Sequence, residues 1–332
     1  MRRSVRFHGM KSKFSSGRGL RALVGIQMIY LVTSIAEARI DLGVLQQQGY
    51  GVVEIKRPHP NTLTVAAKIN GRSTLLILDT GWSGHGITLD REYAGTLETP
   101  LADHTATMHT ISGKSLTGFK KGVVETVLLG NVEMHRVPVV VGYIAGLHDA
   151  SVRRKIGANG FLSAGFLRTC SAVIDLHNLR LYLRPPGTGR RAVLGPALRN
   201  AGLAEIPFGI TGNALAVVNA EINGAAGAMI VDTGKSLTGV DARFASKMKV
   251  LGYSSRVGTI DAAGVLSRTQ LAKIRSFKIG GVNLRAPDLR LEHFPTYTQT
   301  RGKLIGFLGI DILGPNGTII DFGNLKLYCY PL

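Results

Sequence analysis

Cysteine is nearly absent from this chain, in which Cys170 and Cys329 are the only two among 332 residues. Neither a close cysteine pair nor a His-Glu-x-x-His spacing occurs, so we expect no zinc site. The two cysteines leave two alternatives open. They form a single disulfide in an exported protein, or they are buried free thiols that pack as small apolar side chains.

Acidic and aromatic residues are also few. Aromatic residues make up 6% of the chain and glycine occurs 42 times, a balance that favours tight turns and strands over helical bundles. With 40 Lys and Arg against 21 Asp and Glu, the formal net charge is +19. The basic residues are scattered without an aromatic-interleaved motif, so we expect no nucleic-acid partner. The charge favours electrostatic association with an anionic envelope or membrane surface.

Residues 1–38 differ in composition from the rest of the chain. A long basic region without an acidic residue precedes a mostly apolar stretch over residues 22–36, and Ala36-Glu37-Ala38 supplies a cleavage site between small residues. This layout is typical of a secretory signal peptide, and the apolar stretch is short for a membrane-spanning helix. We therefore expect an exported protein, periplasmic or extracellular. An uncleaved signal anchor is the alternative.

Two stretches of the chain share one motif, four apolar residues followed by Asp-Thr-Gly. Residues 75–78 lead into Asp79-Thr80-Gly81, and residues 228–231 lead into Asp232-Thr233-Gly234. An apolar run bounded by glycine predicts a buried strand that ends in a tight turn. A lone buried carboxylate is costly, whereas two carboxylates brought together share one proton. In such a pair, one carboxylate acts as a base on water while the other acts as an acid toward a carbonyl.

The similarity between the two halves extends beyond this motif. An Asn-Gly turn precedes each Asp-Thr-Gly, and a candidate helix start follows each, at Asp90 and at Asp241. Near the end of each half, residues 174–182 match residues 320–328. Two covalently joined lobes of this kind pack about a pseudo-twofold axis, which predicts a monomer. We predict four segments: a signal peptide or anchor (1–38), a first lobe (39–186), a linker (187–203) and a second lobe (204–332).

The doubled Asp-Thr-Gly resembles the motif of the aspartic proteases, the pepsin and retropepsin clan. In that family, a later apolar-apolar-small segment threads past each Asp turn as a ψ-shaped loop, and the matching segments here are Phe161-Leu162-Ser163 and Phe307-Leu308-Gly309. The resemblance covers nearly all of residues 50–332 and is closest to bacterial two-lobed aspartyl proteases. It implies an all-β, bilobal pepsin-like fold built from two duplicated retropepsin-like β-barrel lobes.

The resemblance also implies a role for each motif residue. Asp79 and Asp232 would be the catalytic dyad that holds a water molecule, with no metal or organic cofactor. The hairpin around Ile111-Ser112-Gly113-Lys114 would close over the substrate as a flap. The residues implied to support the dyad are Thr80, Gly81, Ser83, Thr233, Gly234 and Ser236.

Four positions depart from the family pattern. One is Ile111, where pepsin-like flaps carry a Tyr, so the role of that Tyr does not carry over. The residue after each Asp-Thr-Gly is commonly small or hydroxylic, but here it is Trp82 and Lys235. Ser83 and Ser236 follow and would partly replace the missing hydroxyls. Lys235 leaves two alternatives, a positive charge near the dyad that favours its ionised form, or a solvent-directed side chain. Ser163 stands where the first ψ-shaped loop has glycine in the family, at some cost in backbone freedom.

These observations predict an aspartic endopeptidase that cleaves peptides bound extended in the cleft between the lobes. The alternative is a catalytically weak or inactive peptide-binding or envelope-associated protein on the same fold. A binding protein has no need of a second buried carboxylate, so the intact pair favours the enzyme.

Overall fold

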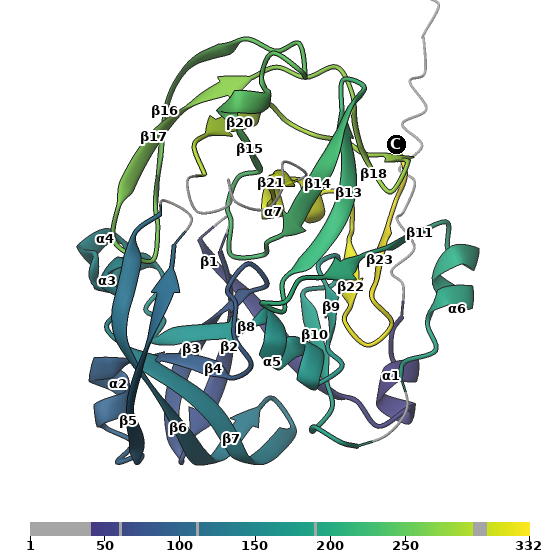
Figure 1. Cartoon of the computed structure of the whole chain (residues 1–332). Coiled ribbons are helices and arrows are strands. Elements are labelled where there is room, and N and C mark those ends of the chain that lie inside the picture. The colour runs from purple at the N-terminus through teal and green to yellow at the C-terminus, as the bar shows by residue number, and fades with distance from the viewer. Residues whose placement is uncertain (1–40, 60–61, 111–112, 189–190, 295–303) are drawn as a thin grey trace, which may run out of the picture. The chain divides into compact units, whose positions relative to one another are not determined.

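The computed structural model describes residues 41–332, except residues 60–61, 111–112, 189–190 and 295–303. The predicted signal segment, residues 1–38, therefore lies outside the described residues. Residues 39–332 form one compact unit, built mostly from strands (Figure 1). None of the helices in the described part is long and apolar enough to span a membrane.

The first lobe is a set of hydrogen-bonded strands with short helices at their ends. In this lobe, β3 pairs in parallel with β8, and β8 pairs antiparallel with β4. The long strands β5, β6 and β7 form an antiparallel meander. The strands are β1 (Gly51–His59), β2 (Thr62–Ile69), β3 (Arg72–Asp79), β4 (Ile87–Asp90), β5 (Leu101–His109), β6 (Ser115–Leu129), β7 (Val132–Gly142) and β8 (Gly160–Ser163). The helices are α1 (Val44–Gln47), α2 (Arg91–Gly95), α3 (Ala145–His148), α4 (Ala150–Lys155) and α5 (Ala164–Thr169).

The second lobe repeats the central part of this arrangement. Here β14 pairs in parallel with β21, and β21 pairs antiparallel with β15. The strands are β12 (Gly209–Ile210), β13 (Ala216–Ile222), β14 (Ala225–Val231), β15 (Gly239–Asp241), β16 (Gly252–Ile260), β17 (Leu266–Ala272), β18 (Phe277–Ile279), β19 (Val282–Asn283), β20 (Leu289–Glu292) and β21 (Leu304–Leu308). A 3-10 turn, η1 (Ala242–Phe244), and α7 (Ile310–Leu313) complete the lobe.

The two lobes meet in one shared sheet, in the strand order β11-β23-β22-β9-β10-β1. Its central pair is β9 against β22, in which Ile174 lies opposite Ile320. These two residues occupy equivalent positions in the repeated sequence, so the contact is self-complementary, as at the twofold axis of a dimer. The predicted pseudo-twofold axis is thus visible in the pairing register. The strands not yet given are β9 (Val173–Asp175), β10 (Arg180–Leu183), β11 (Ala204–Pro207), β22 (Ile319–Asp321) and β23 (Lys326–Cys329).

Local turn chemistry follows the sequence in both lobes. Asn70 and Gly71 join β2 to β3 with φ of 45° and 79°, and Asn223 and Gly224 join β13 to β14 with φ of 50° and 86°. Positive φ at both positions is the requirement of a tight hairpin turn, which Asn-Gly satisfies with little strain. Each Asp-bearing strand therefore starts from a hairpin, as predicted.

The two predicted helix starts are confirmed. The Asp90 carboxylate accepts a hydrogen bond from the Glu92 amide at the beginning of α2, at 2.9 Å, and Asp241 accepts one from the Arg243 amide at 3.0 Å. A further short helix, α6 (Gly195–Asn200), lies within the predicted linker, whose bounds stay a prediction.

Both cysteines are free and buried, as the second of the two alternatives predicted. Burial raises the pKa of Cys170 and of Cys329 to about 12. The Cys170 sulfur lies 3.9 Å from the sulfur of Met134, in an apolar environment. The thiols therefore serve as packing groups.

One apolar core runs through both lobes beneath the two Asp-Thr-Gly turns. Leu78 and Leu162 belong to it in the first lobe, Val231 and Leu308 in the second, and all four side chains are fully buried. Close packing of this kind fixes the strands that carry the turns. It therefore holds Asp79 and Asp232 on a rigid base.

Candidate active site

Each Asp-Thr-Gly turn is anchored by the strand that threads past it. Asp79 ends β3 and pairs in parallel register with Ser163 on β8. Asp232 follows β14, and its amide donates to the carbonyl of Leu308 on β21, at 2.9 Å. The two ψ-shaped loops predicted from the family resemblance are therefore present in both lobes.

The threonines of the two turns bond across the lobe boundary. The Thr80 hydroxyl donates to the Val231 carbonyl, and the Thr233 hydroxyl donates to the Leu78 carbonyl, both at 2.7 Å. Each hydroxyl also accepts the amide of the other threonine, at 2.9 Å and 3.1 Å. Both side chains are fully buried. Four hydrogen bonds of Thr80 and Thr233 thus connect the two turns.

The glycines of the turns allow each carboxyl group to lie against the opposite lobe. A Cβ atom on Gly81 would lie 2.3 Å from Cγ of Asp232, and one on Gly234 would lie 2.3 Å from Cγ of Asp79. The glycine amides donate within their own turns, Gly81 to Asp79 and Gly234 to Asp232, each at 2.9 Å. This reciprocal packing brings the two carboxyl groups together.

The two carboxyl groups have unequal surroundings. Burial, and then the negative charge of Asp232, raise the pKa of Asp79 well above its ordinary value. Burial also raises the pKa of Asp232, but the positive charge of Lys235 and the amides of Gly234 and Lys235 oppose this rise. The two carboxyl groups titrate as a unit, and the positive charge of Lys235 acts on the Asp232 side of the pair.

The Lys235 side chain does not point into solvent, so the predicted alternative of a solvent-directed side chain is wrong. Its ammonium lies 2.7 Å from the Glu292 carboxylate, and the two side chains are 9% and 8% exposed. The ammonium also lies 5.7 Å from the ring of Phe294 and 5.9 Å from that of Phe307. The positive charge of Lys235 lowers the pKa of Asp232, against the effect of burial. The positive charge is thus held near the dyad, in agreement with the other alternative.

Trp82 occupies the equivalent position in the first lobe and is also buried. Its indole N–H donates to the Thr88 hydroxyl at 2.8 Å, and its ring stacks on Phe161 with centroids 4.5 Å apart. Leu116 and Phe119 of β6 belong to the same apolar cluster. Trp82 therefore provides an apolar wall that joins the Asp79 turn to the β5–β6 hairpin.

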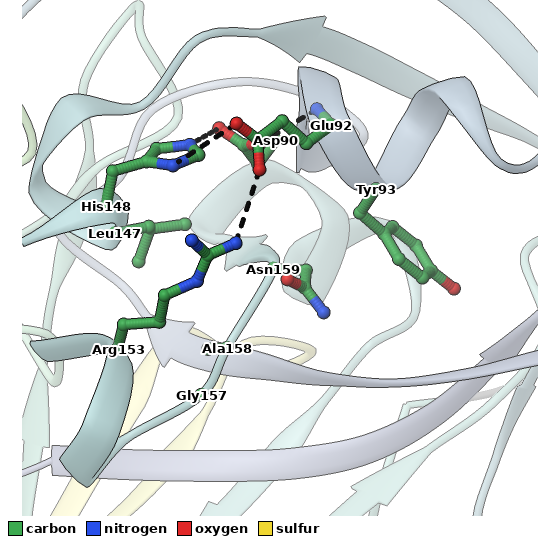
Figure 2. Close-up of a pocket in the computed structure, with 9 residues that line it drawn as sticks. All are labelled: Asp90, Glu92, Tyr93, Leu147, His148, Arg153, Gly157, Ala158 and Asn159. Carbon is green, nitrogen blue, oxygen red and sulfur yellow. Dashed lines mark hydrogen bonds and ion pairs between the residues drawn. The ribbon is translucent and has the colours of Figure 1, made fainter. Parts of the chain in front are cut away.

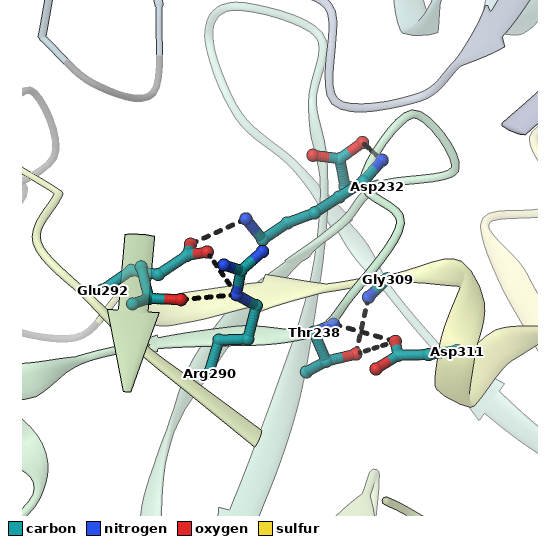
Figure 3. Close-up of polar contacts among 8 residues, drawn as sticks. Asp232, Thr238, Arg290, Glu292, Gly309 and Asp311 are labelled. Atoms are coloured by element: carbon teal, nitrogen blue, oxygen red, sulfur yellow. Dashed lines mark hydrogen bonds and ion pairs between the residues drawn. The ribbon is translucent and has the colours of Figure 1, made fainter. Parts of the chain in front are cut away.

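The hydroxyl groups that support the ψ-shaped loops differ between the lobes. In the first, the Ser163 hydroxyl donates to the Gly86 carbonyl at 2.8 Å and accepts the Phe166 amide at 3.2 Å. In the second, the Thr238 hydroxyl accepts the Gly309 amide at 2.9 Å and donates to Asp311 at 2.7 Å (Figure 3). Ser163 has φ of −78°, an ordinary value, so the serine introduces no backbone strain.

Sequence reasoning missed the contribution of Thr238 and Asp311. Burial raises the pKa of Asp311, against the hydrogen bonds that it accepts from Thr238. The only signal in the sequence was the position of Asp311 two residues after Gly309, which by itself does not reveal a partner on another strand. The supporting roles predicted for Ser83 and Ser236 stay predictions.

The predicted flap corresponds to the tip of the β5–β6 hairpin. Ile111 and Ser112 lie outside the described residues. Around them, the Thr110 amide donates to the Lys114 carbonyl at 2.9 Å and the Gly113 amide donates to the Thr110 carbonyl at 3.0 Å. The residues on either side therefore close a tight turn.

A second hairpin, β16–β17, reaches the first lobe. Figure 1 shows it extending from the second lobe to α3. At the contact, the Gly146 amide donates to the Ala262 carbonyl at 2.9 Å. A Cβ atom on Gly146 would lie 2.2 Å from the Asp261 carbonyl oxygen, so the backbones are in direct contact. The hairpin thus adds a further contact between the two lobes.

A separate polar pocket of about 260 Å³ lies in the first lobe (Figure 2). Potential ligand atoms of Asp90, Glu92 and His148 lie within 4.8 Å of one another there. However, Asp90 already accepts the Glu92 and Ile144 amides and lies 3.0 Å from His148. Arg153 lies 3.2 Å from Glu92. These contacts engage the carboxylates, so we interpret the cluster as a structural network that fixes α2, α3 and α4.

Two comparisons with known proteins found matches. Residues 65–162 and 218–312 match the family described as aspartyl protease, and each range contains one Asp-Thr-Gly. The chain is also similar to the crystal structure of an aspartic proteinase from Irpex lacteus, with a TM-score of 0.49 and 14% sequence identity. That match covers 85% of this chain and 97% of the other. No curated protein matches the chain.

Proposed function

Because this chain belongs to the aspartyl protease family, we propose that it is an aspartic endopeptidase whose dyad is Asp79 and Asp232. The observation that carries the proposal is the reciprocal packing of each carboxyl group against the glycine of the opposite turn. A shared proton and a bound water molecule are the chemistry that two carboxyl groups in this arrangement provide.

The unequal surroundings of the two aspartates suggest their roles in hydrolysis. Ionised Asp232 takes a proton from the water molecule, which attacks the peptide carbonyl, while protonated Asp79 donates its proton to the carbonyl oxygen. The tetrahedral intermediate then collapses with cleavage of the C–N bond, as Asp232 gives its proton to the leaving amine and Asp79 takes a proton from a hydroxyl of the diol, which restores both aspartates. The cross-bonded threonines hold both carboxyl groups in place throughout, because preorganised groups lower the barrier without moving.

We place the substrate as an extended peptide in the cleft between the lobes, beneath the β5–β6 hairpin. Extended peptides bind to strands through main-chain hydrogen bonds, and side-chain pockets set the preference. Trp82 belongs to one buried apolar cluster with Leu116 and Phe119 of this hairpin, which supports a fixed position of the hairpin beside the Asp79 turn.

We also propose that residues 1–38 direct the protein to export. The layout of basic residues, apolar stretch and small residues supports this destination. Without residues 1–38, 33 Lys and Arg remain against 20 Asp and Glu, and this net charge of +13 would favour electrostatic association with anionic envelope surfaces. Cell fractionation with N-terminal sequencing of the recovered protein tests both the destination and the cleavage after Ala38. A full-length protein in the cytoplasm would contradict the proposal.

The proposed activity is tested by cleavage of a diverse peptide library with the wild-type protein, Asp79→Asn and Asp232→Asn. Asp41→Asn, at an exposed aspartate far along the chain from both turns, is the matched control. We expect cleavage by the wild type and by the control, and loss in both dyad variants and with a statine-type inhibitor. A folded wild-type protein that binds peptides without cutting them would support the peptide-binding alternative instead.

A further inference from the structure

The residue that follows each Asp-Thr-Gly distinguishes the two lobes. The backbone is the same in both, since the amides of Trp82 and Lys235 each lie 3.3 Å from the carbonyl oxygen of the aspartate in their turn. In addition, the Lys235 amide donates to the Asp232 carboxylate at 3.0 Å. The side chains differ completely, because Trp82 contributes an apolar ring and Lys235 a buried positive charge.

The Lys235–Glu292 pair is almost inaccessible to water, at 9% and 8% exposure. Removing two charges from water is costly, and a buried pair of this kind adds little net stability over apolar side chains of similar size. Gly239 leaves the necessary space, since a Cβ atom there would lie 2.5 Å from a Glu292 oxygen and 3.0 Å from Cε of Lys235. The fold therefore accommodates a charge pair next to Asp232 without an evident gain in stability.

Several charged groups face Lys235 from the surrounding elements. Asp232 lies on the same turn, with Asp79 on the opposing turn of the first lobe. Glu292 is on β20, and Arg290 on the same strand lies 3.5 Å from the second Glu292 oxygen. Arg290 is fully buried and its Nε donates to Thr269 on β17 at 2.6 Å. Asp311 on α7 interacts electrostatically with Arg290. Glu292 thus contacts two cations, Lys235 and Arg290.

We propose that Lys235 is a positioning residue that holds Asp232 as the ionised member of the dyad, and that Glu292 limits how strongly the Lys235 charge acts. This inference rests on the proposed peptidase function of the dyad. In it, a buried ammonium that bonds to Glu292 stands where the family commonly has a small or hydroxylic side chain. The difference between the two aspartates then has two sources, the positive charge of Lys235 in the second lobe and the apolar ring of Trp82 in the first.

Two neutralising substitutions should act in opposite directions. Lys235→Met keeps roughly the length of the side chain near Phe294 and Phe307 but removes the positive charge, so the Asp232 carboxylate loses stabilisation. We expect the acid limb of the kcat/KM profile to move about one pH unit higher, the effect of one nearby charge in a partly screened site. Glu292→Gln leaves the Lys235 charge less balanced, and we expect the acid limb to move to lower pH.

Lys235→Arg provides the rescue test, because it keeps the charge and changes the shape. The acid limb of its kcat/KM profile should lie closer to the wild-type limb than the acid limb of Lys235→Met does. A merely structural role for Lys235 predicts a lower kcat in all three variants. The acid limbs of their kcat/KM profiles would then stay at the wild-type pH, or all move in the same direction. Either pattern would overturn the proposal. If Lys235→Met does not fold, the displacement in Glu292→Gln and the position of the Lys235→Arg limb still decide.

A carboxyl-carbon NMR titration of protein labelled with ¹³C-aspartate separates this inference from the proposed function. It follows the ionisation of the dyad in the full protein whether or not peptides are cleaved. Opposite displacements of the dyad resonances in Lys235→Met and Glu292→Gln support the inference even in an inactive protein. Unchanged dyad titration in both variants rejects it even if the wild type is an active peptidase.

Discussion

Thr80→Val removes one hydroxyl group from the contact between the lobes and keeps the size of the side chain. The Val231 carbonyl then loses its donor, and the Thr233 amide loses its acceptor. The site is fully buried, so water cannot replace either partner. Each buried polar group left unpaired costs about 1–3 kcal/mol, so the expected loss is about 2–6 kcal/mol. This is a large part of the roughly 5–15 kcal/mol by which proteins are typically stable.

The free energy of unfolding can be measured by urea denaturation with tryptophan fluorescence, because Trp82 is the only tryptophan and is buried near the turn. Thr80→Ser retains the hydroxyl and should lose only about 1 kcal/mol for the missing methyl group. Thr64→Val is the matched control, since the buried Thr64 hydroxyl has no hydrogen-bond partner among the described residues. It should be neutral or stabilising. Equal effects of Thr80→Val and Thr64→Val would refute the reasoning.

Three further predictions concern the dyad and the thiols. Gly81→Ala places a Cβ atom 2.3 Å from Cγ of Asp232, so we expect peptidase activity to fall at least tenfold while circular dichroism shows the fold retained. Unchanged activity would contradict the packing of the carboxyl group. The pKa of Asp79 is raised in the folded protein. Its favourable contribution to the free energy of unfolding is therefore present in acid and is lost as the pH rises through the pKa of the folded protein. Asp79→Asn should therefore be more stable than the wild type at neutral pH, and this difference should disappear in acid. A difference in stability that does not change with pH would argue against the raised pKa of Asp79. In the native protein, Cys170 and Cys329 should resist alkylation at mildly alkaline pH. After unfolding without a reductant, both thiols should react. If neither thiol reacts in the unfolded protein, the two cysteines form a disulfide.

The features predicted from the sequence are those that each half of the chain encodes locally and repeats. The apolar runs before Asp79 and Asp232 predicted buried strands, and the Asn-Gly pairs predicted the hairpins that start them. Because the halves are similar, their equivalent residues had to meet about a pseudo-twofold axis. The pairing of Ile174 with Ile320 is the direct result.

The features that were not predicted depend on contacts between distant, dissimilar segments. Glu292 lies 57 residues after Lys235, and no local pattern indicates that the two form a buried pair. The contact of Thr238 with Asp311 has the same origin. The approach of the β16–β17 hairpin to Gly146 depends on its curvature, which the alternation of side chains does not determine.

The central claim is that Asp79 and Asp232 act as one pair that shares a proton. The most direct test is the pH dependence of kcat/KM for peptide cleavage by the wild-type protein across the acid and neutral range. A singly protonated pair predicts a bell-shaped profile, with an acid limb from the ionised member and a basic limb from the protonated one. A rate that stays flat across that range would contradict the account.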